Sequence, residues 1–210
     1  MTRHLLSFCL AVTTTFTAQA GEKFFLGLTA GGNYSGTTEM KTLKSGFNGG
    51  LSAVHVLGTH WQLEYSLLYS REDAAIKTNA EFATEFYGKP VTRRSYLRLP
   101  VQVSYVFGKR TQPLRPRLFA GPSLGGLVGN SDNIRSKEPN ICIVDYPGHP
   151  VAVSEIGVRA GVGVQWRISR HFMTMLDAAW TEGLTKATAY PNSGIRNRNL
   201  QANASILFSF

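Results

Sequence analysis

Apolar and polar residues alternate along eight segments of the chain, and a period of two residues is typical of β-strands. In the clearest segment, Leu63 and Tyr65 fall on one face and Glu64 on the other. Each segment is about ten residues long, the length of a tilted strand that crosses a bilayer. The eight segments are residues 24–33, 46–57, 60–70, 96–107, 117–128, 152–168, 171–181 and 199–210. The register of residues 46–57 stays open because the segment is rich in Gly.

The links between these segments alternate in length. Three are short (58–59, 108–116 and 169–170) and four are long (34–45, 71–95, 129–151 and 182–198). With strands running up and down, all long links then leave one end and both termini lie at the other. Outer-membrane barrels have this layout, with short periplasmic turns and long extracellular loops. We therefore predict an all-β fold, an eight-stranded antiparallel up-and-down transmembrane β-barrel in the bacterial outer membrane.

A soluble barrel shows the same alternation with its apolar face turned inward, so the orientation needs its own evidence. The polar positions of residues 199–210 are Asn, Gln and Ser, whereas a water-exposed face carries Lys and Glu. Aromatic residues gather near the segment ends, as they do at the two interfaces of a bilayer. Phe208 and Phe210 end the last apolar register, like the C-terminal signal read by the barrel-assembly machinery. These features favour apolar side chains on lipid.

The inward register then collects charged side chains. An eight-stranded barrel is just wide enough to be filled by its own side chains, and buried charges need partners. We expect one ion pair between Glu64 and Arg98, and a second between Asp177 and either Arg159 or Arg117. A polar plug is the favoured interpretation of this network, and a gated pore is the alternative.

Composition narrows the class of protein further. Of the 210 residues, 17% are charged, against roughly 25% in a soluble globular chain. An aromatic content of 11% excludes intrinsic disorder. No apolar run approaches the roughly 18 residues of a membrane-spanning helix, which excludes a helical bundle.

Residues 1–20 are predicted to be a secretory signal peptide, and residues 21–210 the barrel domain. Arg3 and His4 precede an apolar stretch, and Ala18-Gln19-Ala20 forms a cleavage site. Without Arg3, 21 Lys and Arg stand against 13 Asp and Glu, so the mature chain carries a net charge of +8. Cys142 is then its single thiol, which excludes an internal disulfide.

The positive charge falls mainly at the two predicted ends. We expect the basic residues of the long links to face the phosphates of lipopolysaccharide; the alternative is that these loops are only solvated. The basic residues are Lys41, Lys44, Arg71, Lys77, Lys89, Arg93, Arg94, Arg135, Lys137, Lys186, Arg196 and Arg198. A second basic set marks the periplasmic rim and consists of Lys109, Arg110, Arg115, Arg167 and Arg170. Nucleic acid is not an expected partner of an exported membrane protein.

No constellation of residues predicts catalysis. His55, His60, His149 and His171 are scattered without metal-ligand spacing. We expect no enzyme activity, no cofactor and a monomer with a structural or interaction role. The alternatives are a surface receptor or adhesion barrel that acts through its long loops, and a lipid-modifying barrel enzyme.

Three strand phrases carry a family resemblance: YLRLPVQVSYVF from Tyr96, RLFAGPSLGG from Arg117 and IGVRAGVGVQ from Ile156. They are similar to the PorT-like outer-membrane β-barrel family of Bacteroidota, over most of residues 22–210. The resemblance implies an eight-stranded outer-membrane barrel without known enzyme activity. Pro100 and Pro122 belong to these phrases; because each removes a ladder donor, we expect both at β-bulges.

Overall fold

The structure, a computed structural model, describes residues 24–37, 44–75, 91–133, 154–185 and 196–209. Residues 1–20, Cys142, His149 and Phe210 therefore lie outside the described residues. Among the described residues, no helix is long and apolar enough to cross a membrane. The strands are β1 (Phe24–Thr37), β2 (Lys44–Val56), β3 (Trp61–Ala75), β4 (Val91–Val106), β5 (Leu114–Asn133), β6 (Ser154–Arg167), β7 (Phe172–Gly183) and β8 (Asn197–Phe208).

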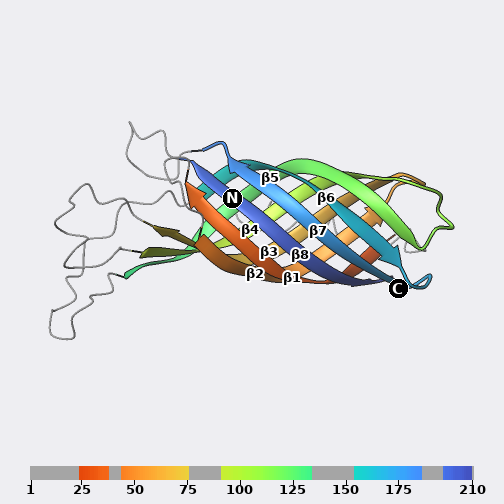
Figure 1. Ribbon diagram of the computed structural model, residues 1–210, viewed down its shortest axis with the longest axis horizontal. Coiled ribbons are helices and arrows are strands. Elements are labelled where there is room, and N and C mark those ends of the chain that lie inside the picture. Colours follow the sequence, from red (N-terminus) through yellow and green to blue (C-terminus); the bar gives the residue numbers. More distant parts are fainter. Residues whose placement is uncertain (1–23, 38–43, 76–90, 134–153, 186–195, 210) are drawn as a thin grey trace, which may run out of the picture.

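The eight strands close into one antiparallel barrel in sequence order, with β8 paired to β1 (Figure 1). Following directly paired residues once around the barrel from Phe24 leads back to β1 at Tyr34, ten residues further on. With this shear and eight strands, ordinary strand spacing and rise give a tilt of about 40°. The predicted fold class is confirmed.

The alternation seen in the sequence separates the outside of the barrel from the inside. Leu28 and Leu176 are 67% and 64% exposed, whereas Asn33 and Gln201, on the opposite register, are each 1% exposed. In β2, whose register the sequence left open, Leu51 points outward and Ser52 inward. Apolar residues thus cover the outside of the sheet, and mainly polar residues fill the inside.

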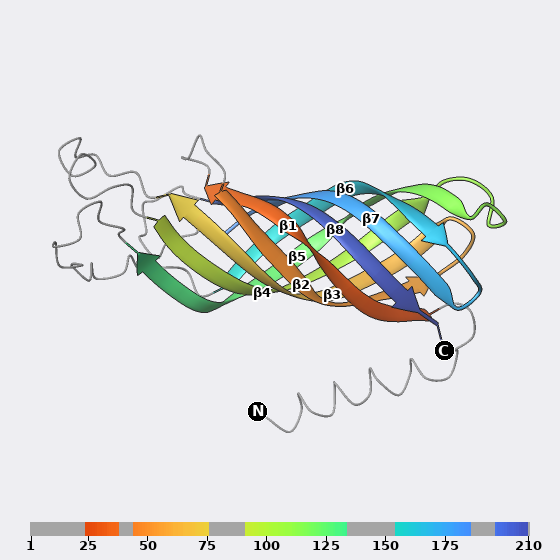
Figure 2. The same ribbon diagram turned by 60° about the horizontal axis from the view of Figure 1, so that its bottom comes forward.

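Three short turns lie at one end of the barrel together with the end of β8 (Figure 2). This end is called the turn end below, and the opposite one the outer end. The strands have 12 to 20 residues and exceed the expected ten. The longest strands are three neighbours, β3, β4 and β5. At the outer end the β3–β4 ladder continues to the pair Ala75–Val91 and the β4–β5 ladder to the pair Val91–Asn133.

The two prolines inside strands correct one expectation. The only register shift of the β4–β5 ladder lies between Ser95 and Tyr96, not at Pro100 or Pro122. The β3–β4 pairs break off at Tyr65–Val101 and resume in the same register at Leu68–Arg98. Each proline thus lies beside a local gap in a ladder, because its missing N–H removes hydrogen bonds without adding a residue to the strand.

Candidate functional site

The interior of the barrel is layered along its axis, and the first layer at the turn end is apolar. Its buried members come from β1, β2, β7 and β8 and are Phe25, Val54, Val56, Met173, Met175 and Leu207. The Arg167 guanidinium lies 5.2 Å from the centre of the Phe25 ring. On the β1, β2, β7 and β8 side, the lumen is therefore filled by hydrocarbon where the strands leave the turns, whereas Gln62, Arg115 and Gln165 are buried on the other side.

The next layer is an ion cluster around Arg117 on β5. Its Nε and Nη2 donate to the two carboxylate oxygens of Asp177 at 3.0 and 2.9 Å. Nη2 also donates to Glu64 Oε2 at 3.0 Å, and Nη1 donates to Glu64 Oε1. The Ser104 hydroxyl donates to the same Glu64 oxygen. With its side chain 1% exposed, Arg117 joins β3, β5 and β7 across the lumen.

A second ion cluster lies nearer the outer end, around Arg98 on β4. Arg98 Nε and Nη2 donate to the two oxygens of Glu72 at 2.6 and 2.8 Å. Its Nη1 donates to Glu155 Oε1 at 3.1 Å. Asn199 Nδ2 donates to Glu72 at 2.8 Å and Asn197 Nδ2 to Glu155 at 2.6 Å. Side chains of β4 and β8 thus hold both carboxylates, which come from β3 and β6.

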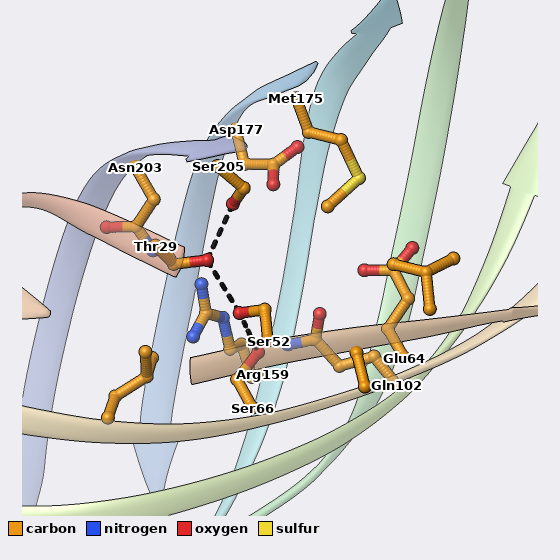
Figure 3. A pocket seen from close by; sticks show the side chains of 13 residues that line it. Thr29, Ser52, Glu64, Ser66, Gln102, Arg159, Met175, Asp177, Asn203 and Ser205 are labelled. Carbon is orange, nitrogen blue, oxygen red and sulfur yellow. Dashed lines mark hydrogen bonds between the residues drawn. The ribbon is translucent and has the colours of Figure 1, made fainter. Parts of the chain in front are cut away.

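Arg159 lines a small cavity together with Glu64 and Asp177 of the Arg117 cluster (Figure 3). The cavity volume is about 20 Å³, which is room for a water molecule. Across the cavity, Thr29 Oγ1 lies 2.6 Å from Ser52 Oγ and 2.7 Å from Ser205 Oγ. With the Asn203 amide turned to satisfy both groups, its oxygen accepts from Arg159 Nη2 at 3.0 Å. Arg159 Nε is buried and has no protein partner among the described residues, so a bound water fits this position.

On the outside, aromatic side chains form two bands. At the turn end, Trp61 and Phe107 contact Tyr105 edge-on, with ring centres 5.0 and 4.9 Å away. At the outer end the Phe47 and Tyr69 ring centres are 6.1 Å apart. The step of ten residues from Phe24 to Tyr34 spans about 33 Å along the strand. At a strand tilt of about 40° this corresponds to about 25 Å along the barrel axis. That is the height of the apolar band of a bilayer-spanning barrel.

Comparison with known families agrees with this geometry. Residues 17–189 match the model of a family described as "Outer membrane protein beta-barrel domain". The chain belongs to this family. Its members' setting, the bacterial outer membrane, is thereby that of this barrel, and the apolar outer surface is its contact with lipid. A search among curated protein sequences finds no significant match.

Solved structures share the fold of this outer-membrane barrel at low sequence identity. Neisserial surface protein A is 15% identical with a TM-score of 0.56, covering 89% of this chain and 97% of that chain. The outer membrane protein OprG from Pseudomonas aeruginosa is 10% identical with a TM-score of 0.50, covering 89% of this chain and 93% of that one. At these identities the likeness shows the fold alone.

The ion pairs of the outer-membrane barrel differ in part from those expected. The pair Glu64–Arg98 is not formed: Glu64 binds Arg117, and Arg98 binds Glu72 and Glu155. The reason is the register, since Glu64 lies opposite Gln102, while Arg98 lies opposite Leu68, four residues further along β3. Of the two partners considered for Asp177, Arg117 makes the ion pair.

Sequence reasoning missed three features of this interior. Glu72 was placed in a long link, although it continues the inward register of β3 past Ser70. The apolar layer was missed because one polar inner face was assumed along the whole strand. Its signal is apolar residues on both registers, as at Phe24-Phe25 and at Ile206-Leu207-Phe208. Arg115, expected on the rim, is instead 5% exposed.

The two phenylalanines expected to form the assembly signal are only partly described. Phe208 ends β8 and faces outward at 48% exposure. Its ring centre lies 4.9 Å from that of Phe172 on the neighbouring strand. Phe210 lies outside the described residues, so the signal remains a prediction.

Proposed function

We propose that this outer-membrane barrel is sealed along its axis and has a structural or interaction role rather than a catalytic one. The observation that carries the proposal is the layered interior. Apolar side chains fill the turn end, and the Arg117 and Arg98 clusters fill the levels above it with buried, multiply bonded side chains. The cavity beside the Arg117 cluster, with a volume of about 20 Å³, has room for a water molecule.

The apolar layer is the part of this interior best suited to stop ions. Polar clusters can exchange protein partners for water, whereas a hydrophobic constriction blocks conduction by excluding water. Phe25, Met173 and Leu207 are each 0% exposed. The seal therefore lies at the turn end, below both ion clusters.

The proposed topology has the turn end in the periplasm, with both termini, and the long links outside the cell. Its support is the order of the strands, which brings three turns of a few residues to one end of the barrel (Figure 2). Short turns face the periplasm in outer-membrane barrels. Insertion by the barrel-assembly machinery and a monomeric state are part of the same proposal.

The positions of the described histidines support the non-catalytic role. His55, His60 and His171 belong to the turn end, away from the outer rim where a lipid-modifying site would lie, and His149 lies outside the described residues. Within the described ranges, no group of three His, Cys, Asp or Glu residues is placed to hold a metal ion. The family resemblance of the strand phrases to PorT-like barrels is consistent with the same role.

Interaction at the outer end is the second candidate. Strands β3, β4 and β5 extend beyond the outer aromatic band, where Tyr69 pairs with Leu97 and the ladder runs on to Ala75 and Val91. Such an extension offers a receptor or adhesion surface above the membrane. Arg196 adds positive charge at this end, where it suits the phosphates of lipopolysaccharide, whereas Arg198 is paired with Glu182 at 3.0 Å.

Conductance in planar bilayers tests the sealed lumen. The folded chain, identified by heat-modifiable migration on gels, is expected to give little or no steady current. Met173→Ala, which thins the apolar layer, should raise the current, whereas Glu155→Gln in the outer cluster should not. A stable, large channel in the unchanged protein would contradict the seal. Conduction by Glu155→Gln alone would move the seal to the ion clusters.

A further inference from the structure

Two basic residues belong to the inner face of the barrel at its outer end, above the Arg98 cluster. Lys44, the first residue of β2, lies opposite Ser35 on β1, and Ser35 is buried. Arg94 on β4 lies opposite Glu72 on β3, which is also buried. Because directly opposite residues of an antiparallel pair share one face of the sheet, both cations are on the inner face. Lys44 and Arg94 are called the outer-mouth cations below.

This placement differs from the one expected from the sequence. Both residues were expected in or beside the long links, where they would face lipopolysaccharide in the surrounding leaflet. The strands are longer than expected, and the alternation of inner and outer faces in β2 and β4 reaches Lys44 and Arg94. A side chain on the inner face is separated from the leaflet by the barrel wall. The outer-mouth cations therefore meet solutes that enter the lumen from this end.

The described carboxylates on the inner face at this end already have other partners. Glu72 accepts hydrogen bonds from Arg98 and Asn199, and Glu155 accepts from Arg98 and Asn197. Among the described side chains, no carboxylate forms an ion pair with either outer-mouth cation. Together with Arg98, the outer-mouth cations make three positive charges against two carboxylates. This end of the described lumen therefore has a net charge of +1.

Arg94 also has a buried donor that is not used. The positive charge of Arg94 acts on the hydroxyl of Tyr96, a buried side chain that accepts from Asn197 Nδ2 at 3.3 Å. The Arg94 guanidinium thus lies near the top of the Arg98 cluster. Its Nε is buried and has no hydrogen-bond partner in the described part of the chain. A buried donor without a partner is unfavourable, and an acceptor that enters the mouth would satisfy it.

The chemistry of the outer-mouth cations indicates an oxyanion. A guanidinium presents its N–H donors in a planar fork that matches the oxygens of a phosphate, and an ammonium adds a compact positive charge. The interior of an eight-stranded barrel is just wide enough for its own side chains, so a compact group fits between β2 and β4. Below this group, the Arg98 cluster fills the lumen with buried side chains.

We propose that Lys44 and Arg94 bind the phosphate or sulfate group of a small solute at the outer opening of the lumen. Arg94 donates from Nε and from its terminal nitrogens, and Lys44 supplies the second positive charge. The inference rests on the proposed interaction role at the outer end and names the chemistry of its ligand. With the proposed topology, this opening faces the surroundings of the cell.

NMR titration of the Arg94 Nε–H group tests the proposal. The full mature chain is isotope-labelled and placed in detergent micelles without lipid, and chloride is replaced stepwise by inorganic phosphate or sulfate at constant ionic strength. We expect a saturable shift of the Arg94 Nε–H signal, which is assigned by its absence from Arg94→Gln. No shift, or a shift that does not saturate, would overturn the proposal and would leave water as the partner of Nε.

Matched variants test the second cation and the source of the oxyanion. Lys44→Gln should weaken the apparent affinity about tenfold, the size of one charge-assisted hydrogen bond, whereas Lys109→Gln at the turn end should leave it unchanged. Equal affinity in Lys44→Gln, or an equal loss in Lys109→Gln, would contradict the site. Added lipopolysaccharide should not displace the phosphate; displacement would assign the outer-mouth cations to lipid instead. A failed titration would leave the seal intact, because conductance measures the seal separately.

Discussion

Replacing Arg117 with Met is expected to cost about 3–5 kcal/mol of unfolding free energy, the range for removing one partner from a buried ion pair. The Arg117 side chain is 1% exposed and binds Glu64 and Asp177, so its loss leaves two buried carboxylates without their main cation. Met preserves most of the side-chain length, so the change in packing is small. The nearby positive charge of Arg159 acts favourably on both carboxylates. The loss of unfolding free energy should therefore be near the lower limit of this range.

A matched double variant separates charge from packing. Arg117→Met with Glu64→Gln removes more hydrogen bonds but restores the balance of one cation, Arg159, and one carboxylate, Asp177. It should therefore recover at least half of the loss. Urea unfolding in lipid vesicles, followed by tryptophan emission, measures both values. Equal or greater destabilisation of the double variant would refute the explanation by unbalanced charge.

Two further predictions concern packing and the turns. Gly161→Ala should destabilise the barrel by about 1–3 kcal/mol, because the added Cβ would lie 2.7 Å from Phe119 Cε2. Gly126→Ala is the control: nothing lies within 4 Å of the added carbon, so the stability should change little in the same urea assay. Arg115→Met should speed hydrogen exchange of residues 57–60 and 107–113 because it removes the bond to Thr59 O; unchanged exchange at both turns would show that Arg115 does not hold them.

Side-chain direction was predictable from the sequence because the period of a strand is two residues. In β8, Leu200 and Ile206 face outward and Gln201 and Ser205 inward, as the alternation predicts. Closure was also predictable, since a sheet in hydrocarbon has to pair every backbone group. Both conclusions depend only on local pattern and on the solvent around the chain.

Ion-pair partners were not predictable in the same way because they depend on height along the axis. Height combines position in a strand with a shear of ten residues around the barrel. Arg98 and Glu64 share the inner face but lie at different levels, so each finds other partners. Strand ends are equally hard to predict from the alternation alone. The segment expected at residues 60–70 stops before Glu72, although β3 continues to Ala75.

The direction of the side chains relative to lipid is tested most directly by nitroxide labels placed one at a time at residues 200–206 of β8. The background is the full mature chain in lipid vesicles with Cys142→Ser. Oxygen, which dissolves in hydrocarbon, should relax labels at 200, 202, 204 and 206 strongly and those at 201, 203 and 205 weakly. Uniform accessibility along the strand, or strong relaxation at the odd positions, would contradict a barrel with its apolar face on lipid.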